Sequence, residues 1–286
     1  MTSPDDPPGR DGTPQSRAPA ADEGPAFDVV FADTCIGGST VASRLVRTRQ
    51  GLRAFYFADY SVNPLGVKSP TDVRAALNRW VFMARARSST LIVACNTASV
   101  LLKETPGVLQ RAVELGMTVH SMVDLMETLL REESAALEGE SVCLMGTRFT
   151  VNRPLYGDLL MERGVGSVLP LPATRTERAI AHLDHESVKG RAAILEEIGP
   201  AVKESDSIVL ACTCFPLVAD LVQELNSSIR LLDPARGVDD LPIAGRGEGR
   251  NLLTIGLTEG GPGLEKIRAQ APILFPGWEL EGLVLL

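Results

Sequence analysis

The sequence lacks several features that would place the protein in a special class. No apolar run approaches the roughly 18 residues that a membrane-spanning helix needs, and the N-terminus has no apolar core of a secretory signal. No cluster of Lys and Arg stands out in a chain with a formal net charge of −8, so an electrostatic grip on nucleic acid is not expected. We therefore expect a cytoplasmic protein that binds neither membranes nor nucleic acid.

Cysteine is also scarce. The chain has 5 cysteines in 286 residues, an odd number in a sequence too large to need disulfides, so a disulfide scaffold is not expected. Apolar residues make up 44% of the chain and charged residues 22%, which is enough for one or two globular domains with sizeable cores. If the cysteines are important, they act as thiols.

Short apolar runs alternate with longer amphipathic stretches. FDVVFAD, RAFYFAD and TLIVAC are predicted strands, with helices over 39–49 and 71–87; the second half repeats this plan with SVCLMGT, SVLPLP and SIVLAC and helices over 155–163 and 186–203. The strand runs are apolar at nearly every position, as in parallel sheets that helices cover on both faces. We predict an α/β fold of two similar lobes related by a pseudo-twofold axis, each a parallel-type sheet flanked by helices, with the active site between them.

The lobe boundaries follow from composition. Residues 1–26 carry no large aliphatic side chain after Met1 and are predicted to be a disordered leader. The first lobe is predicted to comprise residues 27–122 plus 239–286, and the second lobe residues 123–238. The closing segment, NLLTIGLTEGG followed by a helix and APILFPG, has strand-like pieces but no new site, so we assign it to the first lobe, with the crossing in the Gly/Asp/Pro-rich stretch before it.

Two of the strand runs end in the same way. Ala94-Cys95-Asn96-Thr97 and Ala211-Cys212-Thr213-Cys214 each place a cysteine and small polar residues after a buried strand. Ligands of open α/β sheets bind beyond the carboxyl ends of the strands, so each lobe should present one cysteine to a shared cleft. A lone cysteine at a strand end is more often a small buried residue, but the matched pair favours a functional interpretation.

These two motifs, with Asp33-Thr34-Cys35-Ile36-Gly37-Gly38 and Asn63-Pro64-Leu65-Gly66-Val67-Lys68-Ser69 ahead of them, resemble the aspartate/glutamate racemase superfamily, and within it the glutamate racemases. The resemblance extends over about residues 27–286. It implies a racemase without a cofactor, in which the thiolate of Cys95 or Cys212 removes the α-proton and the other thiol returns one on the opposite face. Asp33 then assists proton transfer or meets the substrate ammonium.

The resemblance also implies a set of substrate-binding residues at the strand ends. We expect hydroxyls, amides and helix N-termini there to stabilise charge on the substrate carboxylate and to lower a thiol pKa toward neutrality. Capping of the next helix is the alternative for the Thr147 and Thr150 hydroxyls, and closure of its own turn is the alternative for Asp33. The set comprises Thr34, Leu65, Gly66, Asn96, Thr97, Thr147, Thr150, Thr213 and Cys214.

The chain departs from the family pattern at several positions. Cys214 stands where the family has a histidine, Ala173 where it has a glutamate, and Leu65 where it has a tyrosine, so a second acid/base helper is expected to be missing. Cys35 replaces a glycine and brings a third thiol toward the cleft, unless it is only a small filler. Zinc held by Cys212, Cys214 and a further cysteine is not expected, because structural zinc sites prefer cysteines two to four residues apart.

We therefore expect a racemase or epimerase of an acidic amino acid, with no cofactor and no metal. A decarboxylase or cis-trans isomerase of a small dicarboxylate, as found elsewhere in the superfamily, is the second hypothesis, and the changes at positions 214 and 173 favour it somewhat. A catalytically decayed two-lobed binding protein is the third, although a binder has no need of two opposed thiols. The expected partner is a small amino acid or dicarboxylate; a homodimer stays open.

Overall fold

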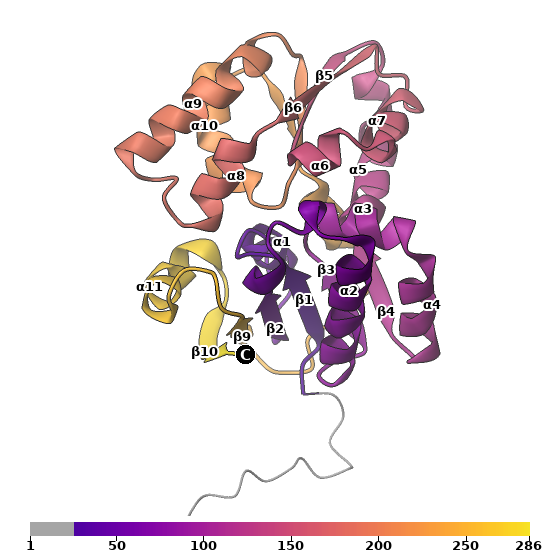
Figure 1. The fold of residues 1–286 in the computed structure, drawn as a ribbon, viewed down its shortest axis with the longest axis vertical. Helices are drawn as coiled ribbons and strands as arrows, with labels where there is room; N and C mark the ends of the chain where they lie inside the picture. The colour runs from indigo at the N-terminus through magenta and orange to yellow at the C-terminus, as the bar shows by residue number, and fades with distance from the viewer. Residues whose placement is uncertain (1–25) are drawn as a thin grey trace, which may run out of the picture.

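Two parallel sheets form the framework of the protein. The computed structural model describes residues 26–286, so the predicted leader, apart from Ala26, lies outside the described residues. Figure 1 shows the elements of the second sheet above those of the first. Every strand pair within the two sheets is parallel, and helices flank both sheets, so the predicted α/β class is confirmed.

The strands are buried from both sides, which explains their continuous apolar runs. In β1, Val29 and Phe31 pack into one core and Val30 and Ala32 into another. In spatial order the first sheet contains β10 (Glu279–Leu285), β9 (Leu252–Leu257), β2 (Arg53–Ala58), β1 (Val29–Asp33), β3 (Thr90–Val93) and β4 (Thr118–Ser121). The second sheet contains β6 (Ser167–Pro172), β5 (Ser141–Gly146), β7 (Ser207–Ala211) and β8 (Arg230–Leu232).

Helices cover each face of each sheet. On the first sheet α1 (Ser39–Leu45) and α11 (Leu264–Leu274) pack on one face, and α2 (Pro70–Arg85), α3 (Asn96–Glu104) and α4 (Pro106–Glu114) on the other. On the second sheet α8 (Thr174–Ala181), α9 (Val188–Lys203) and α10 (Ala219–Leu225) oppose α5 (Met122–Leu137), α6 (Arg148–Val151) and α7 (Pro154–Met161). Short 3-10 helices are η1 (Tyr60–Val62), η2 (Leu65–Val67), η3 (Phe215–Val218) and η4 (Pro234–Asp240).

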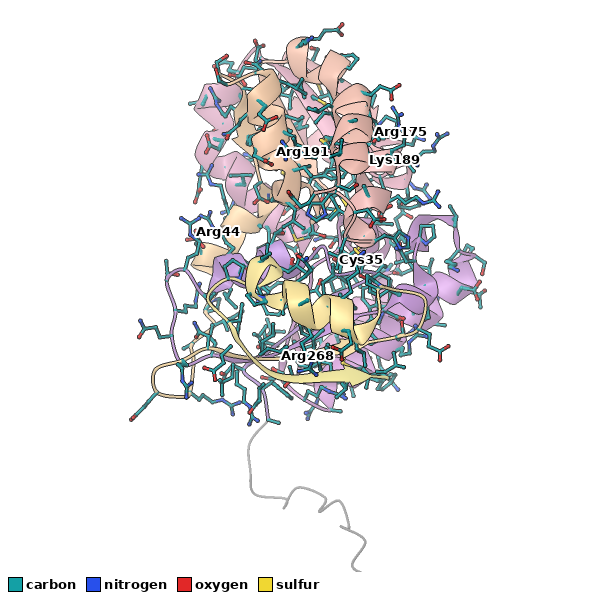
Figure 2. All side chains as sticks on the ribbon, turned by 90° about the vertical axis from the view of Figure 1, so that its left-hand side faces the viewer. Cys35, Arg44, Arg175, Lys189, Arg191 and Arg268 are labelled. Atoms are coloured by element: carbon teal, nitrogen blue, oxygen red, sulfur yellow. The ribbon has the colours of Figure 1, made fainter. Side chains whose placement is uncertain are left out.

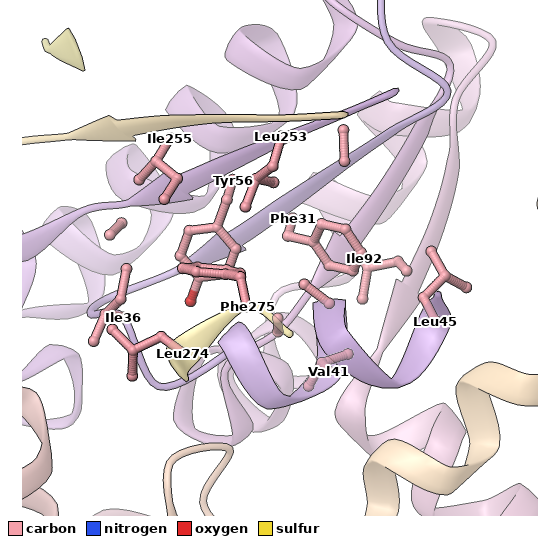
Figure 3. Packing of buried hydrophobic residues seen from close by; sticks show 14 of the residues in the cluster. Phe31, Ile36, Val41, Leu45, Tyr56, Ile92, Leu253, Ile255, Leu274 and Phe275 are labelled. Carbon is pink, nitrogen blue, oxygen red and sulfur yellow. The ribbon is translucent and has the colours of Figure 1, made fainter. Parts of the chain in front are cut away.

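One aromatic cluster supports the loop that follows β1. The rings of Tyr56 and Phe275 meet edge to face with centroids 5.1 Å apart, inside the core drawn in Figure 3. The Tyr56 hydroxyl donates to the Cys35 carbonyl (3.0 Å), and the Tyr60 hydroxyl accepts from the Ile36 N–H (3.1 Å). The hydrophobic core that contains Tyr56, Tyr60 and Phe275 therefore fixes the backbone of the turn at residues 33–36.

The C-terminal segment differs from its prediction. The APILFPG run is not strand-like: Ala271–Leu274 continue α11, because Ala271 and Leu274 are buried on the helix face that packs on the sheet. The closing strand β10, which was not predicted, pairs with β9 instead. The first helix ends at Leu45, before the predicted residue 49, and the Arg49 guanidinium bonds the carbonyls of the crossing segment.

The two sheets divide the strands as the two-lobe scheme requires, with β9 and β10 returning to the first sheet. The lobe boundaries themselves remain a prediction. Throughout residues 26–286 no helix is both long and apolar enough to cross a membrane.

We predict that Gly37→Ala destabilises the protein, because the two lobes approach closely there. A Cβ at Gly37 would lie 2.6 Å from the Cβ of Cys214, so the two backbones must separate. Overpacking of this kind costs about 1–3 kcal/mol, measurable by urea unfolding. Gly157→Ala is the matched control: it lies in α7 with nothing within 4 Å of the added Cβ, and should raise stability by up to about 1 kcal/mol. Equal changes in stability for the two variants would show that the lobes are not closely packed at Gly37.

Candidate active site

A cavity of about 210 Å³ lies at the carboxyl ends of β1, β3 and β7, where the two sheets face each other. Its size suits a metabolite smaller than the drug-sized ligands of ordinary pockets. Figure 2 shows Cys35 between the two halves of the molecule. The lining residues are Asp33, Thr34, Cys35, Asn63, Pro64, Leu65, Gly66, Val67, Cys95, Thr97, Thr147, Arg148, Phe149, Thr174, Glu177, Cys212 and Thr213.

Cys95 and Cys212 reach this cavity from different sheets. Cys95 follows β3 and is the N-cap residue of α3, and Cys212 follows β7. Their side chains are almost enclosed, with 7% and 9% of their surface exposed. The Thr34 hydroxyl lies 3.8 Å from the Cys95 sulfur. The structure thus places both predicted thiols in one enclosed space.

Asp33 links the two cysteine motifs. Its carboxylate accepts from the backbone N–H groups of Thr34 (2.6 Å) and Gly38 (2.7 Å), and from the Thr213 hydroxyl of the other lobe (3.2 Å). Burial raises the pKa of Asp33 to about 6, and hydrogen bonds, the strongest from the Cys95 thiol, keep it from rising further. Asp33 both closes its own turn and contacts a proton-carrying sulfur.

Three threonine hydroxyls form a triangle across the lobes. The Oγ1 atoms of Thr97 and Thr147 are 3.0 Å apart, those of Thr97 and Thr150 3.3 Å, and those of Thr147 and Thr150 3.0 Å. Thr147 also caps α6 by accepting from the Thr150 N–H. Thr97 and Thr147 line the cavity, whereas Thr150 lies behind them.

Asn96 turns away from the cavity. Its amide oxygen faces the backbone N–H groups of Cys212 (3.3 Å) and Thr213 (3.2 Å), and its amide nitrogen faces the Tyr156 hydroxyl. Asn96, from the first lobe, therefore holds the second cysteine turn. The N–H groups of Cys212 and Thr213, which were expected to donate to the substrate carboxylate, donate to Asn96 instead. Cys214 is also outside the lining, 1% exposed behind Cys212.

The segment after β2 forms an apolar wall. Leu65 and Gly66 begin η2 at the cavity, as predicted from the sequence. A Cβ on Gly66 would lie 2.5 Å from the Phe149 Cβ, so only glycine allows this approach of η2 to α6. Phe149 and Val67 complete the apolar side, and the sequence had not singled them out.

The expected lowering of the thiol pKa is wrong for Cys95. Burial raises the pKa of this thiol well above its usual range, the charge of Asp33 adds to the effect, and the Ala98 N–H at the start of α3 offsets only part of it. The second turn leads into the 3-10 helix η3, so no α-helix dipole acts directly on Cys212. Desolvation outweighs the helix N-terminus in this cavity.

Glu177 supplies a carboxylate that the sequence reasoning missed. It stands one helical turn after Ala173 on α8 and lines the cavity, so the cavity has a second carboxylate although position 173 lacks one. Burial first, and then the charge of Asp33, raise the pKa of Glu177 to about 7, while Arg178 and a hydrogen bond with Asn63 act against the rise. Residues one turn apart on a helix share a face, which is the signal that could have identified Glu177.

Arg148 adds a cation at the cavity mouth, also unforeseen from the sequence. It begins α6, is exposed, and has no ion pair within residues 26–286. Asn63, Pro64 and Thr174 complete the lining residues that the sequence analysis did not assign to the site. Over the same range, no group of three or more His, Cys, Asp or Glu side chains is placed to hold a metal ion.

Comparison with known proteins gives consistent relatives. The model of the Asp/Glu/Hydantoin racemase family matches residues 65–237. A glutamate racemase of Clostridium perfringens is 26% identical over 212 residues, 72% of this chain and 78% of the relative. Solved glutamate racemases share the fold: that of Campylobacter jejuni has a TM-score of 0.70 at 19% identity over 86% of this chain and 96% of its own. That of Francisella tularensis, in complex with D-glutamate, has a TM-score of 0.71 at 17% identity over 91% and 97%.

We predict that Asn96→Ala destabilises the protein by about 2 kcal/mol or more, because it leaves the Tyr156 hydroxyl and the N–H groups of Cys212 and Thr213 buried without their partner. Urea unfolding measures the loss. Asn78→Ala makes the same substitution on the exposed face of α2 and should change stability by no more than about 0.5 kcal/mol. A loss as small as that of the control would mean that Asn96 does not hold the second cysteine turn.

Proposed function

Because the chain belongs to the Asp/Glu/hydantoin racemase family and is therefore a racemase, an isomerase, we propose that it inverts the α-carbon of an acidic amino acid with the thiols of Cys95 and Cys212. The observation that carries the proposal is the presence of both thiols in one small, enclosed cavity, each from the carboxyl end of a strand in a different sheet. Inversion needs a proton acceptor on one face and a donor on the other, and two opposed lobes provide them.

The reaction needs groups that hold and move protons. One thiolate takes the α-proton, the opposite thiol gives its proton to the other face, and the reverse reaction exchanges their roles. Asp33 is hydrogen-bonded to the Cys95 thiol, and its pKa of about 6 suits a group that shares the thiol proton near neutral pH. Hydroxyls of Thr34 and Thr97 at the cavity support the charge that develops on the substrate carboxylate, while the Thr213 hydroxyl donates to Asp33.

The charges in the cavity favour an amino acid over a dicarboxylate. Asp33 and Glu177 bring two carboxyl groups to the lining, and a substrate ammonium would pair with either of them. A dicarboxylate without an ammonium would face these groups with only Arg148 as a cation on the lining. An ammonium entering the cavity also offsets the burial that raises the pKa of Cys95, so the substrate itself favours the thiolate.

The position of Arg148 favours a substrate with an acidic side chain. Its guanidinium at the cavity mouth can take a carboxylate in a bidentate pair, and the apolar wall of Leu65, Val67 and Phe149 would contact the methylene groups. The glutamate racemase of Francisella tularensis, which shares the fold, was solved in complex with D-glutamate.

Four further expectations belong to the same proposal. They are a cytoplasmic location, independence of cofactors, a homodimer, and the lobe division at residues 27–122 plus 239–286 and 123–238.

We expect Cys95→Ala and Cys212→Ala each to lower racemisation of glutamate or aspartate by more than about 100-fold, because each removes the group that accepts the proton in one direction of inversion and donates it in the other. Chiral chromatography measures inversion, and proton NMR in deuterated water measures α-deuterium. Cys143→Ala is the matched control, since Cys143 lies in the core on β5, away from the cavity. Near wild-type inversion by either site variant would rule out two bases.

We expect the KM of the amino acid to rise about tenfold between pH 8 and pH 6, because Glu177, with a pKa of about 7, then loses the charge that meets the ammonium. Glu177→Gln should show a high KM that is flat over this range. Glu196→Gln, on the exposed side of α9, is the control and should keep the wild-type profile. An unchanged pH profile in Glu177→Gln would exclude Glu177 from ammonium binding.

A further inference from the structure

Two sulfur atoms lie unusually close at the second cysteine turn. The Sγ atoms of Cys212 and Cys214 are 3.2 Å apart. The Cys212 side chain lines the cavity, and Cys214 is buried behind it against Gly37. A disulfide brings its sulfur atoms to about 2.05 Å, so the pair needs an approach of little more than about 1 Å to close. One thiol of the pair therefore faces the cavity, and the other is buried directly behind it.

The surroundings give the two thiols different roles. Burial raises the pKa of Cys214 well above its usual range, and its hydrogen bond and proximity to Cys212 raise it further. Cys214 therefore keeps its proton, and its sulfur is within hydrogen-bond distance of the Cys212 sulfur. Of the two sulfur atoms, only that of Cys212 lines the cavity and can meet a reagent there, and the Cys214 thiol lies 3.2 Å from it.

We propose that Cys212 and Cys214 form an oxidation site, in which a hydroperoxide that enters the cavity joins the two sulfur atoms in a reversible disulfide. The Cys212 thiolate attacks one peroxide oxygen, the O–O bond breaks, and hydroxide or an alkoxide leaves and takes up a proton. The Cys214 sulfur then attacks the resulting sulfenic sulfur, the S–O bond breaks and water leaves. The peroxide gains the two electrons that the two thiols lose. The loss of activity that would follow rests on the proposed function of Cys212.

Tryptic digestion isolates this site. Residues 204–230 contain both cysteines, no other cysteine, and no Lys or Arg before Arg230. The full-length protein is treated with hydrogen peroxide, its remaining thiols are alkylated under denaturing conditions, and it is digested without reduction. We expect this peptide to appear unalkylated and lighter by about 2 Da than its dithiol form. The alkylated thiols should fall from the five of the untreated chain to three, since two are joined, and dithiothreitol should restore five.

Two variants separate this pair from its neighbours. Cys214→Ala removes the buried thiol of the pair, so Cys212 should instead gain about 32 Da as a sulfinic acid. Cys35→Ala is the matched control: it removes another cavity thiol and should still give the light 204–230 peptide. The digest of the wild-type protein tests for the disulfide even if a variant fails to fold. A disulfide between Cys212 and Cys95 or Cys35, or a sulfinic Cys212 without any disulfide in the wild-type protein, would overturn the proposal.

The mass measurement needs no substrate, so this proposal and the proposed function can fail separately. If the light peptide forms but the oxidised protein still inverts its substrate, the oxidation site stands and the catalytic assignment of Cys212 fails. If Cys212→Ala abolishes inversion while peroxide gives no light peptide, the function stands and the oxidation site fails.

Discussion

The hydrogen bonds of the Asp33 carboxylate are the constraint on which the rest of the site depends. Asp33 ends the central strand of the first sheet, accepts from two N–H groups of its own loop, and receives the hydroxyl of Thr213 from the opposite sheet. Asn96, also in the first lobe, adds a second connection by accepting from the backbone N–H groups of the Cys212 turn. Two residues of the first lobe therefore position the second lobe's cysteine motif, and the backbone of Gly37 packs closely against Cys214 of the same motif.

Enclosure sets the chemistry of this cavity. Burial raises the pKa of Asp33 and Glu177 to about 6 and about 7 and that of Cys95 well above its usual range, so the cavity disfavours negative charge. In the proposed reaction, a substrate ammonium would reverse this balance on entering the cavity. Substrate binding and thiol activation would then be coupled, because the positive charge that pairs with the carboxylates would also stabilise the thiolate.

Two departures from the family pattern acquire a structural meaning. The side chain at position 173 is a buried alanine, and a carboxylate enters the cavity one turn later from Glu177. At position 214 a thiol replaces the expected imidazole and contacts the neighbouring sulfur directly. A cysteine there can donate a hydrogen bond to Cys212, but unlike an imidazole it can also form a covalent bond with it. Under the oxidation proposed above, the same substitution would add sensitivity to oxidants.

The sequence by itself determined most of the strands, though not β4, β8 or β10, together with their parallel arrangement and the convergence of Cys95, Cys212 and Asp33. Continuous apolar runs and residues at strand ends are local signals with one geometric outcome in an α/β fold. Only the tertiary structure decided which neighbours enter the cavity. Glu177 faces it because of the direction in which α8 leaves β6, and Asn96 turns away because the opposite lobe offers it two N–H groups. The pKa of Cys95 likewise depends on how completely the second lobe excludes water, which no local pattern records.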